Sequence, residues 1–240
     1  MENRKSFLTL TSVRILPNLA IRIPTVGEIL EDEQNYYNLI FSLTATPFQY
    51  MVQLDDMGID FTQITDYELF MMLLPAFAHR NMSILFGGTD LSDILVCKNT
   101  QNDMPVLYSP KNNLIIDELV YGQIADGIRK INNLEKETRK PGNDKAKEFR
   151  INLERKKQKR SAGKPYEPYL EKLVVALVNR PEFKYNYEQV NSLTIYQFNQ
   201  SLEQIKTSIH FDKTMIGVYA GTIDTSRLKD KSCLSWLPVK

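Results

Sequence analysis

Apolar residues recur at helical spacing along most of the chain, and strand-like runs interrupt this pattern in two places. In the first, residues Leu19 to Ile23 alternate between apolar and other side chains, and Pro17 supplies a turn before them. This predicts a β-hairpin within 7–23. In the second, four short apolar runs are separated by turn residues, which predicts a small antiparallel meander over about 82–116. The four runs are 83–86, 94–97, 106–108 and 114–116.

Several helix starts are marked by a threonine followed three residues later by glutamate or glutamine. In this capping box the threonine oxygen accepts an orphan backbone N–H, and the later side chain bonds back to the threonine N–H. Four such pairs precede apolar runs and predict helices over about 26–43, 47–57 and 66–74, and after 194. The pairs are Thr25 with Glu28, Thr46 with Gln49, Thr65 with Glu68 and Thr194 with Gln197.

Other helices are predicted from a single cap or an apolar stripe. Asp117 caps a helix that runs to about residue 134. A stripe from Leu170 to Leu177 predicts another helix, and a short helical turn follows Asn186. The side chains expected to face inward on the helix after Asp117 are Leu119, Ile124, Ile128 and Ile131.

The run 69–74 is apolar on every side of a helix. It predicts a central, buried helix that Pro75 ends or kinks. The substitution Leu73→Asp would then bury a carboxylate without a partner and destabilise the fold severely.

These patterns predict an α+β fold that is mostly α-helical, with an N-terminal β-hairpin and the small meander. They also divide the chain into three regions. Residues 1–135 contain the hairpin, the acidic helices and the meander, and 136–165 form a basic charged segment between breaks. Residues 166–240 form a helical region that we expect to pack on the first.

Composition narrows the class of protein. The 240 residues are 42% hydrophobic and 25% charged, which is ordinary for a globular protein and excludes a disordered or disulfide-rich chain. No apolar run is long enough to span a bilayer, and no signal-peptide core is present near the N-terminus. The two cysteines, Cys97 and Cys233, predict a reducing compartment with both thiols unpaired.

The charges are strongly separated along the chain, although 30 basic and 29 acidic residues nearly cancel. Residues 26–70 contain nine acids and no lysine or arginine, whereas 145–164 contain nine basic residues and two acids. Three interpretations are open. The charges are two solvated faces, or they guide docking within the chain or between copies, or the basic block binds nucleic acid.

Motifs for catalysis are missing from the sequence. His79 and His210 have no partner at a catalytic spacing, and there is no phosphate-binding loop, nucleotide fingerprint, metal motif or nucleophile elbow. We therefore expect no catalytic, cofactor-binding or metal-binding residues, and a protein that is not an enzyme.

Three stretches of the sequence resemble a known group of proteins. They are Ile23-Pro-Thr-Val-Gly-Glu-Ile-Leu30, Gln53-Leu-Asp-Asp-Met-Gly-Ile-Asp-Phe61 with the capped helix at Thr65, and Leu193-Thr-Ile-Tyr-Gln-Phe198 with Gly217-Val-Tyr-Ala-Gly-Thr-Ile-Asp224 and Trp236. Together they resemble uncharacterised tail-gene proteins of bacteriophages and prophages of Gram-positive bacteria, most nearly tail assembly chaperones. The likeness covers about the first 75 and last 70 residues and implies no catalytic residue.

The resemblance implies a non-enzymatic morphogenesis protein in the host bacterial cytoplasm. It would assist tail assembly by binding tape-measure or tube proteins, or copies of itself, without a cofactor or a membrane. The first alternative is a structural component of the virion tail or baseplate. The second is a nucleic-acid-binding accessory protein, which the near-neutral net charge disfavours. The candidate contacts to nucleic acid or to an acidic partner are Lys156, Lys157, Lys159 and Arg160, with stacking faces from Tyr166 and Tyr169.

Overall fold

The computed structural model describes residues 6–99 and 103–237, and within them ten α-helices and five β-strands form an α+β fold. The strands are β1 (Ser12–Leu16), β2 (Leu19–Arg22), β3 (Leu95–Lys98), β4 (Pro105–Ser109) and β5 (Leu114–Ile116). The helices are α1 (Val26–Glu31), α2 (Glu33–Thr44), α3 (Met51–Asp56), α4 (Asp66–Phe77), α5 (Ser83–Phe86), α6 (Glu118–Asn132), α7 (Asp144–Ser161), α8 (Leu170–Val178), α9 (Tyr187–Ser192) and α10 (Ile195–Tyr219). Two short 3-10 turns, Thr225–Arg227 and Ser232–Leu234, follow α10.

Both sheets are antiparallel, as the sequence predicts. Strands β1 and β2 form the N-terminal hairpin, and β3, β4 and β5 form a meander in that order. The prediction of a strand at 83–86 is wrong, because these residues form the short helix α5. A four-residue apolar run does not distinguish a strand from a buried helical turn. Here the Asn81 side chain accepts the Ser83 N–H (3.0 Å), and Gly87 ends the helix with a φ of 61°.

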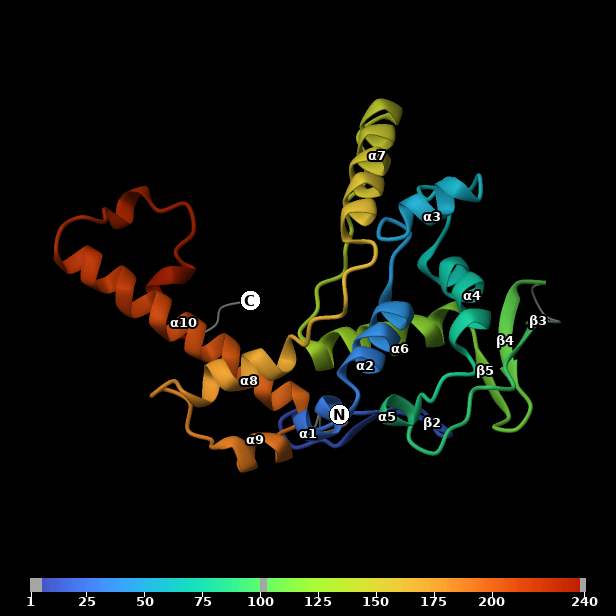
Figure 1. Cartoon of the computed structure of the whole chain (residues 1–240), viewed down its shortest axis with the longest axis horizontal. Coiled ribbons are helices and arrows are strands. Elements are labelled where there is room, and N and C mark those ends of the chain that lie inside the picture. Colours follow the sequence, from blue (N-terminus) through green and yellow to red (C-terminus); the bar gives the residue numbers. More distant parts are fainter. Residues whose placement is uncertain (1–5, 100–102, 238–240) are drawn as a thin grey trace.

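Helix α6 crosses the middle of the molecule (Figure 1). It contacts α2, α4, α10, both strands of the hairpin and β5. Its inward residues Ile124, Ile128 and Ile131 are buried in one large apolar cluster that extends in sequence from Leu19 to Ile205. The expectation for Leu119 is wrong, because this side chain is 71% exposed.

A backbone bridge joins the N-terminal and C-terminal parts of this core. The Val26 N–H donates to the Leu193 carbonyl and the Ile195 N–H to the Pro24 carbonyl, both at 2.8 Å. Two capped helix starts therefore lie side by side, and both belong to stretches that carry the family resemblance. Gly27 allows this close approach, because a Cβ there would lie 3.0 Å from the Asn191 carbonyl oxygen.

Three of the four predicted capping boxes begin helices in the structure, at Thr25, Thr65 and Thr194. The box at Thr46 does not. The Thr46 N–H does donate to the Gln49 side chain (2.9 Å), but residues 47–50 form turns, and α3 begins only at Met51.

Two predicted helices have different boundaries in the structure. The helix expected over 26–43 is two helices, because Asp32 ends α1 and then caps α2 by accepting the Asn35 N–H. Helix α4 does not end at Pro75 but continues to Phe77. Buried Leu74 and Phe77 on either side of the proline offset its missing hydrogen bond.

Helix α4 is also less buried than the sequence predicts. Leu69 and Phe70 are buried, but Met72 is exposed and Leu73 is half-buried. Leu73 packs against both the large cluster and a second, smaller cluster beneath α3. The carboxylate of Leu73→Asp would therefore lie not in a fully buried position, as the sequence predicts, but at a junction of two clusters that solvent partly reaches.

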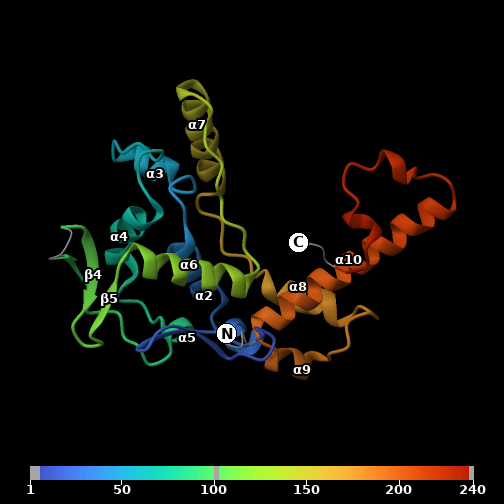
Figure 2. The same ribbon diagram turned by 180° about the vertical axis from the view of Figure 1, so that it is seen from behind.

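Two helices project from this body, as the views from the front and from behind both show (Figures 1 and 2). One is α7, which lies within the basic segment 136–165. The other is the distal half of α10 with the tail that follows it. We call residues 206–237 the distal arm.

Candidate protein-binding surfaces

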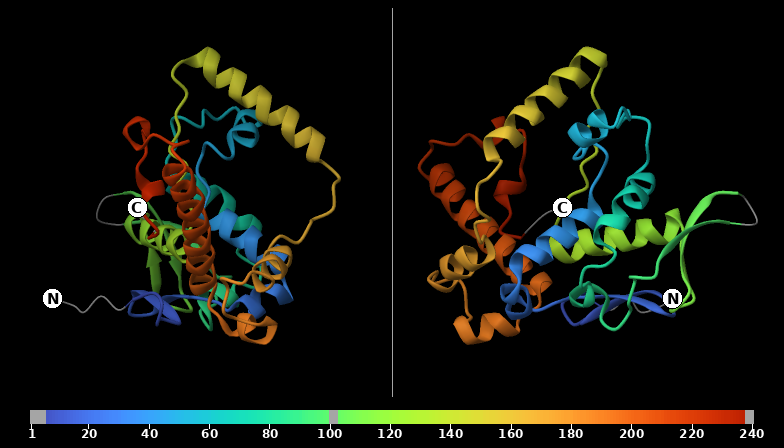
Figure 3. Two further views of the ribbon diagram at one scale, coloured as in Figure 1. Left: turned by 90° about the vertical axis from the view of Figure 1, so that its left-hand side faces the viewer. Right: turned by 45° about the vertical axis from the view of Figure 1, so that its right-hand side comes forward.

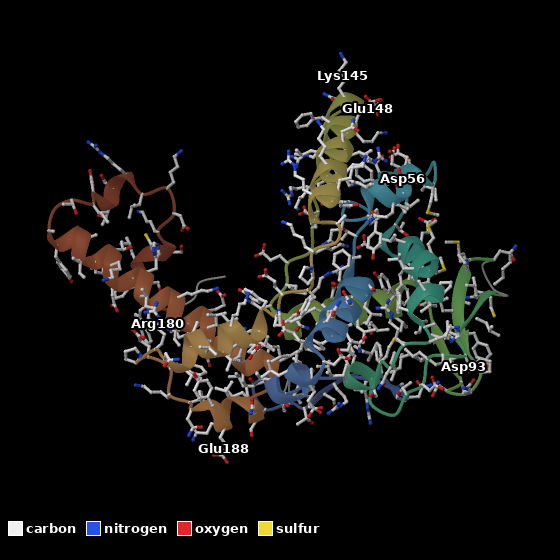
Figure 4. All side chains as sticks on the ribbon, in the orientation of Figure 1. Asp56, Asp93, Lys145, Glu148, Arg180 and Glu188 are labelled. Atoms are coloured by element: carbon white, nitrogen blue, oxygen red, sulfur yellow. The ribbon has the colours of Figure 1, made fainter. Side chains whose placement is uncertain are left out.

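Helix α7 has an inner face that docks on α3. Lys147, Ile151 and Arg155 are four residues apart and so share one side of the helix. Ile151 is buried in the second cluster, with α3 residues Met51, Val52 and Leu54. Basic side chains flank it and reach acids on and after α3, near Asp56 in Figure 4. The ion pairs are Lys147 with Asp60 (2.8 Å) and Arg155 with Asp55 (2.9 Å) and Asp56.

These contacts decide between the interpretations of the separated charges for part of the basic segment. Lys147, together with Thr62, lowers the pKa of Asp60 to about 2, and hydrogen bonding to Asp55 raises the pKa of Arg155. The acidic and basic regions therefore attract each other within one chain. Ion pairs at the surface contribute little to stability individually, so the buried Ile151 provides the main apolar anchor.

Helix α7 also has an outer face, opposite Ile151. Phe149 is 68% exposed and Leu153 is 55% exposed, and both lie on this side. The predicted contact residues Lys156, Lys157, Lys159 and Arg160 are all exposed, and the ion pairs to acids on and after α3 are made by Lys147 and Arg155 instead. Lys157 pairs instead with Glu154 of its own helix (3.6 Å). The outer face is thus an apolar pair bordered by positive charge. Helix α7 itself lies at the edge of the molecule in two further views (Figure 3).

The two predicted stacking residues lie beyond the end of α7, at the start of α8. Tyr169 is exposed, and Tyr166 is partly exposed with its hydroxyl donating to Glu33 Oε1 (2.7 Å). The two tyrosines therefore lie apart from the basic outer face of α7, and the hydroxyl of Tyr166 is hydrogen-bonded to Glu33 of α2.

Glu33 is a buried carboxylate that joins α2 to α8. Besides the Tyr166 hydroxyl, its Oε1 accepts the backbone N–H groups of Tyr169 (2.7 Å) and Leu170 (3.0 Å). Burial alone would raise the pKa of this carboxyl, but these hydrogen bonds outweigh it and hold the pKa below its usual range. The negative charge also lies at the N-terminus of α8, where the helix dipole favours it.

A groove opens between α4, α6 and β4, with a volume of about 730 Å³. Its apolar lining includes Tyr67 and Met71 of α4, Val106 of β4 and Leu119 of α6. Among the described residues that line it are four acids and no lysine or arginine. The acids are Glu68, Asp117, Glu118 and Asp126.

Sequence reasoning missed this groove. Its residues come from three elements that lie far apart in the chain, so no local pattern places them together. The one available signal is Leu119, which follows the capping Asp117 and an exposed Glu118 in the first turn of α6. Helical spacing alone predicts that Leu119 faces the core, whereas in the structure it lines an open groove.

The distal arm is poorly packed. In the described part of the arm, Thr214 is buried and Ile209 packs partly against the large cluster, but no apolar side chain is buried, and the nearest buried apolar residue is Ile205. Ile216 is 62% exposed and Tyr219 is 83% exposed. The tail folds back along α10, where the Gln204 side-chain amide donates to the Trp236 carbonyl (2.8 Å) and the turn Ser232–Leu234 contacts the helix.

Candidate residues of other chemical classes are scattered. His79 and His210 are exposed, and the unpaired Cys97 and Cys233 are both half-buried. Within residues 6–99 and 103–237, no group of three or more histidine, cysteine, aspartate or glutamate side chains could hold a metal ion. Over the same residues, none of the helices is long and apolar enough to cross a membrane.

Comparison with known proteins gives one match. Residues 156–238 match the family model described as YomV second domain, a family of the phage and prophage type. The matched region begins in the second half of α7 and includes α8, α9, α10 and the tail. No curated protein and no solved structure matches the chain. The match therefore supports a phage-type protein and includes the C-terminal stretches on which the resemblance rests.

Proposed function

We propose that this protein is a non-enzymatic phage morphogenesis protein that assists tail assembly by binding another protein chain. The partner class is a tape-measure or tail-tube protein, and the binding takes place in the host bacterial cytoplasm. The phage-type family match supports the setting, and the distal arm supports the mode of action.

The single observation that carries this proposal is the lack of a core in the distal arm. An isolated helical segment gains most of its stability from packing an apolar face, and this arm has no fully buried apolar side chain among its described residues. Ile216 and Tyr219 lie three residues apart on one side of α10 and are both exposed. A second helix laid along this side would bury them and supply the missing packing.

A largely helical partner fits this surface. Helix-in-groove recognition uses apolar anchors at helical spacing, and the arm supplies such anchors on a helix that stands apart from the body (Figure 1). Binding to the distal arm would cover the apolar residues of an aggregation-prone tape-measure protein until tube subunits polymerise around it.

The proposal is tested by co-purification from an infected or induced host. We expect the tagged wild-type chain to retain the tape-measure or tube protein, identified by mass spectrometry. The variant Ile216→Ser with Tyr219→Ser should lose it, because its two exposed anchors become polar. Val175→Ser is the matched control, since Val175 is also exposed and within the matched region but lies on α8. Equal retention by the arm variant would contradict the proposal.

Mass spectrometry of purified particles separates this function from that of a virion component. A chaperone leaves before the particle is complete, so the chain should be absent from mature virions. Its presence there in stoichiometric amounts would instead identify a part of the tail or baseplate.

A further inference from the structure

The geometry points to a second binding event, between two copies of this chain. We propose that the outer face of α7 in one copy docks in the acid-rimmed groove between α4, α6 and β4 of another. The contact is head-to-tail, because it joins two different surfaces. It uses neither Ile216 nor Tyr219, and so it goes beyond the proposed function and can fail independently of it.

The outer face of α7 has the form of a docking helix. Phe149 and Leu153 are four residues apart, and Lys156 and Arg160 follow on the same side. With 100° per residue, all four lie within about 40° of the direction opposite Ile151. Because Ile151 fixes the inner face against α3, the outer face points away from its own chain.

The groove is complementary to this face in both polarity and charge. Its apolar lining, with Met71 and Leu119, would receive the Phe149 and Leu153 side chains. Of the four lining acids, Asp126 pairs with Arg129 (3.0 Å), and no other ion pair of these acids occurs in the described parts of the chain. Glu68 and Glu118 are exposed at the rim, where Lys156 and Arg160 of a second copy would neutralise them.

The fold keeps the two surfaces of one chain apart. Helix α7 stands at one edge of the molecule with its inner side on α3, whereas the groove lies between α4, β4 and the start of α6 (Figure 3). When copies join through two unlike surfaces, one α7 outer face stays open at one end of the assembly and one groove stays open at the other. Such contacts continue into a ring or a filament rather than stop at a dimer.

Two variants block the two surfaces separately. The helix variant, Phe149→Ser with Leu153→Ser, changes only exposed side chains. The groove variant, Gly122→Leu, places a side chain in the groove without disturbing the fold, because a Cβ at Gly122 has no atom within 4 Å. Gly88→Leu is the control, since that site is equally open and lies outside the groove.

The test is sedimentation velocity of the full chain at about 50 mM salt, where surface charges are weakly screened. We expect the wild type and Gly88→Leu to form species larger than a dimer as concentration rises, and to dissociate at high salt. Each blocking variant alone should stay monomeric at concentrations at least tenfold higher. Mixed together they should give a 1:1 dimer and nothing larger, because only one intact helix can meet one intact groove.

A charge exchange tests the electrostatic part. Lys156→Glu with Arg160→Glu should abolish association, and so should Glu118→Lys, whereas a single chain that carries all three changes should associate again, because the new lysine then faces the new acids. A monomeric wild type, or association that persists in both blocking variants, would overturn the proposal. So would a mixture of the two blocking variants that forms no dimer, or changes at Lys156 and Arg160 that weaken the binding of a labelled oligonucleotide and leave self-association unaltered.

Discussion

Helix α10 belongs to two regions of the molecule that are stabilised very differently. Its first part begins at a complete capping box on Thr194 and buries Ile195, Phe198 and Ile205 in the large cluster. Its second part continues the same helix into the distal arm, where Ile216 and Tyr219 face solvent. The backbone is equally helical in both parts, so helix formation alone does not reveal which part contributes to the core.

Helix α7 occupies an intermediate position between these two regions. It has one buried anchor, Ile151, and ion pairs on either side of it. The body is thus held mainly by apolar burial, α7 by one apolar contact with ion pairs, and the distal arm by contacts between the tail and α10. A region with little burial opens easily, and such regions commonly bind partners.

The largest test of this comparison uses two positions on α10. Phe198→Ala should lower the free energy of unfolding by about 3–5 kcal/mol, because Phe198 is completely buried and packs edge-on against Phe183. Ile216→Ala should change it by less than about 0.5 kcal/mol. Urea denaturation followed by circular dichroism measures both. Similar losses at the two positions would show that the distal arm has a core of its own.

The next test concerns the attachment of α8 to the body. Glu33→Gln should lower the free energy of unfolding by about 1.5–3 kcal/mol at neutral pH, because it removes the charge from three hydrogen bonds. Glu31→Gln, on the exposed side of α1, is the control and should leave the free energy of unfolding nearly unchanged.

The pH dependence of this attachment has a definite sign. The folded-state pKa of Glu33 lies below its ordinary value of 4.5, so the unfolded chain binds the proton more readily. The stabilisation is complete above the ordinary pKa and is lost as the pH falls through the folded-state value. The difference between wild type and Glu33→Gln should therefore narrow on acidification. A difference that widens at low pH would contradict this role.

Local signals in the sequence predict much of the body. The capping boxes at Thr25, Thr65 and Thr194 work within four residues of chain, so no knowledge of distant contacts is needed to find them. Helix α6 is predicted nearly to its ends for the same reason, from Asp117 and an apolar stripe.

Features that depend on distant contacts could not be predicted. Thr46 has a capping box but no helix directly after it, and residues 83–86 become a helix in their contact with β2. The groove is lined by residues of three elements, α4, β4 and α6, which come together only in the folded chain. The charge pattern does indicate docking within the chain, but not which lysines and arginines take part, since the choice depends on which side of α7 carries Ile151.

The smallest and most specific test asks which basic residues of α7 hold it against α3. Lys147→Gln with Arg155→Gln should speed amide hydrogen exchange along α7 severalfold at low salt, because both charges face acids near α3. Lys156→Gln with Arg160→Gln removes the same charge from the outer face and is the matched control. At about 1 M salt the inner-face effect should shrink toward that of the control, since surface ion pairs are screened within a few ångströms. Amide exchange along α7 of the inner-face variant should still be slower than in a variant without the Ile151 anchor, such as Ile151→Ser.

Equal acceleration of exchange by the two charge variants at low salt would mean that α7 responds to its total charge. A response confined to the inner face would mean that α3 and α7 are held by the specific pairs, which leaves Lys156 and Arg160 available to a second molecule.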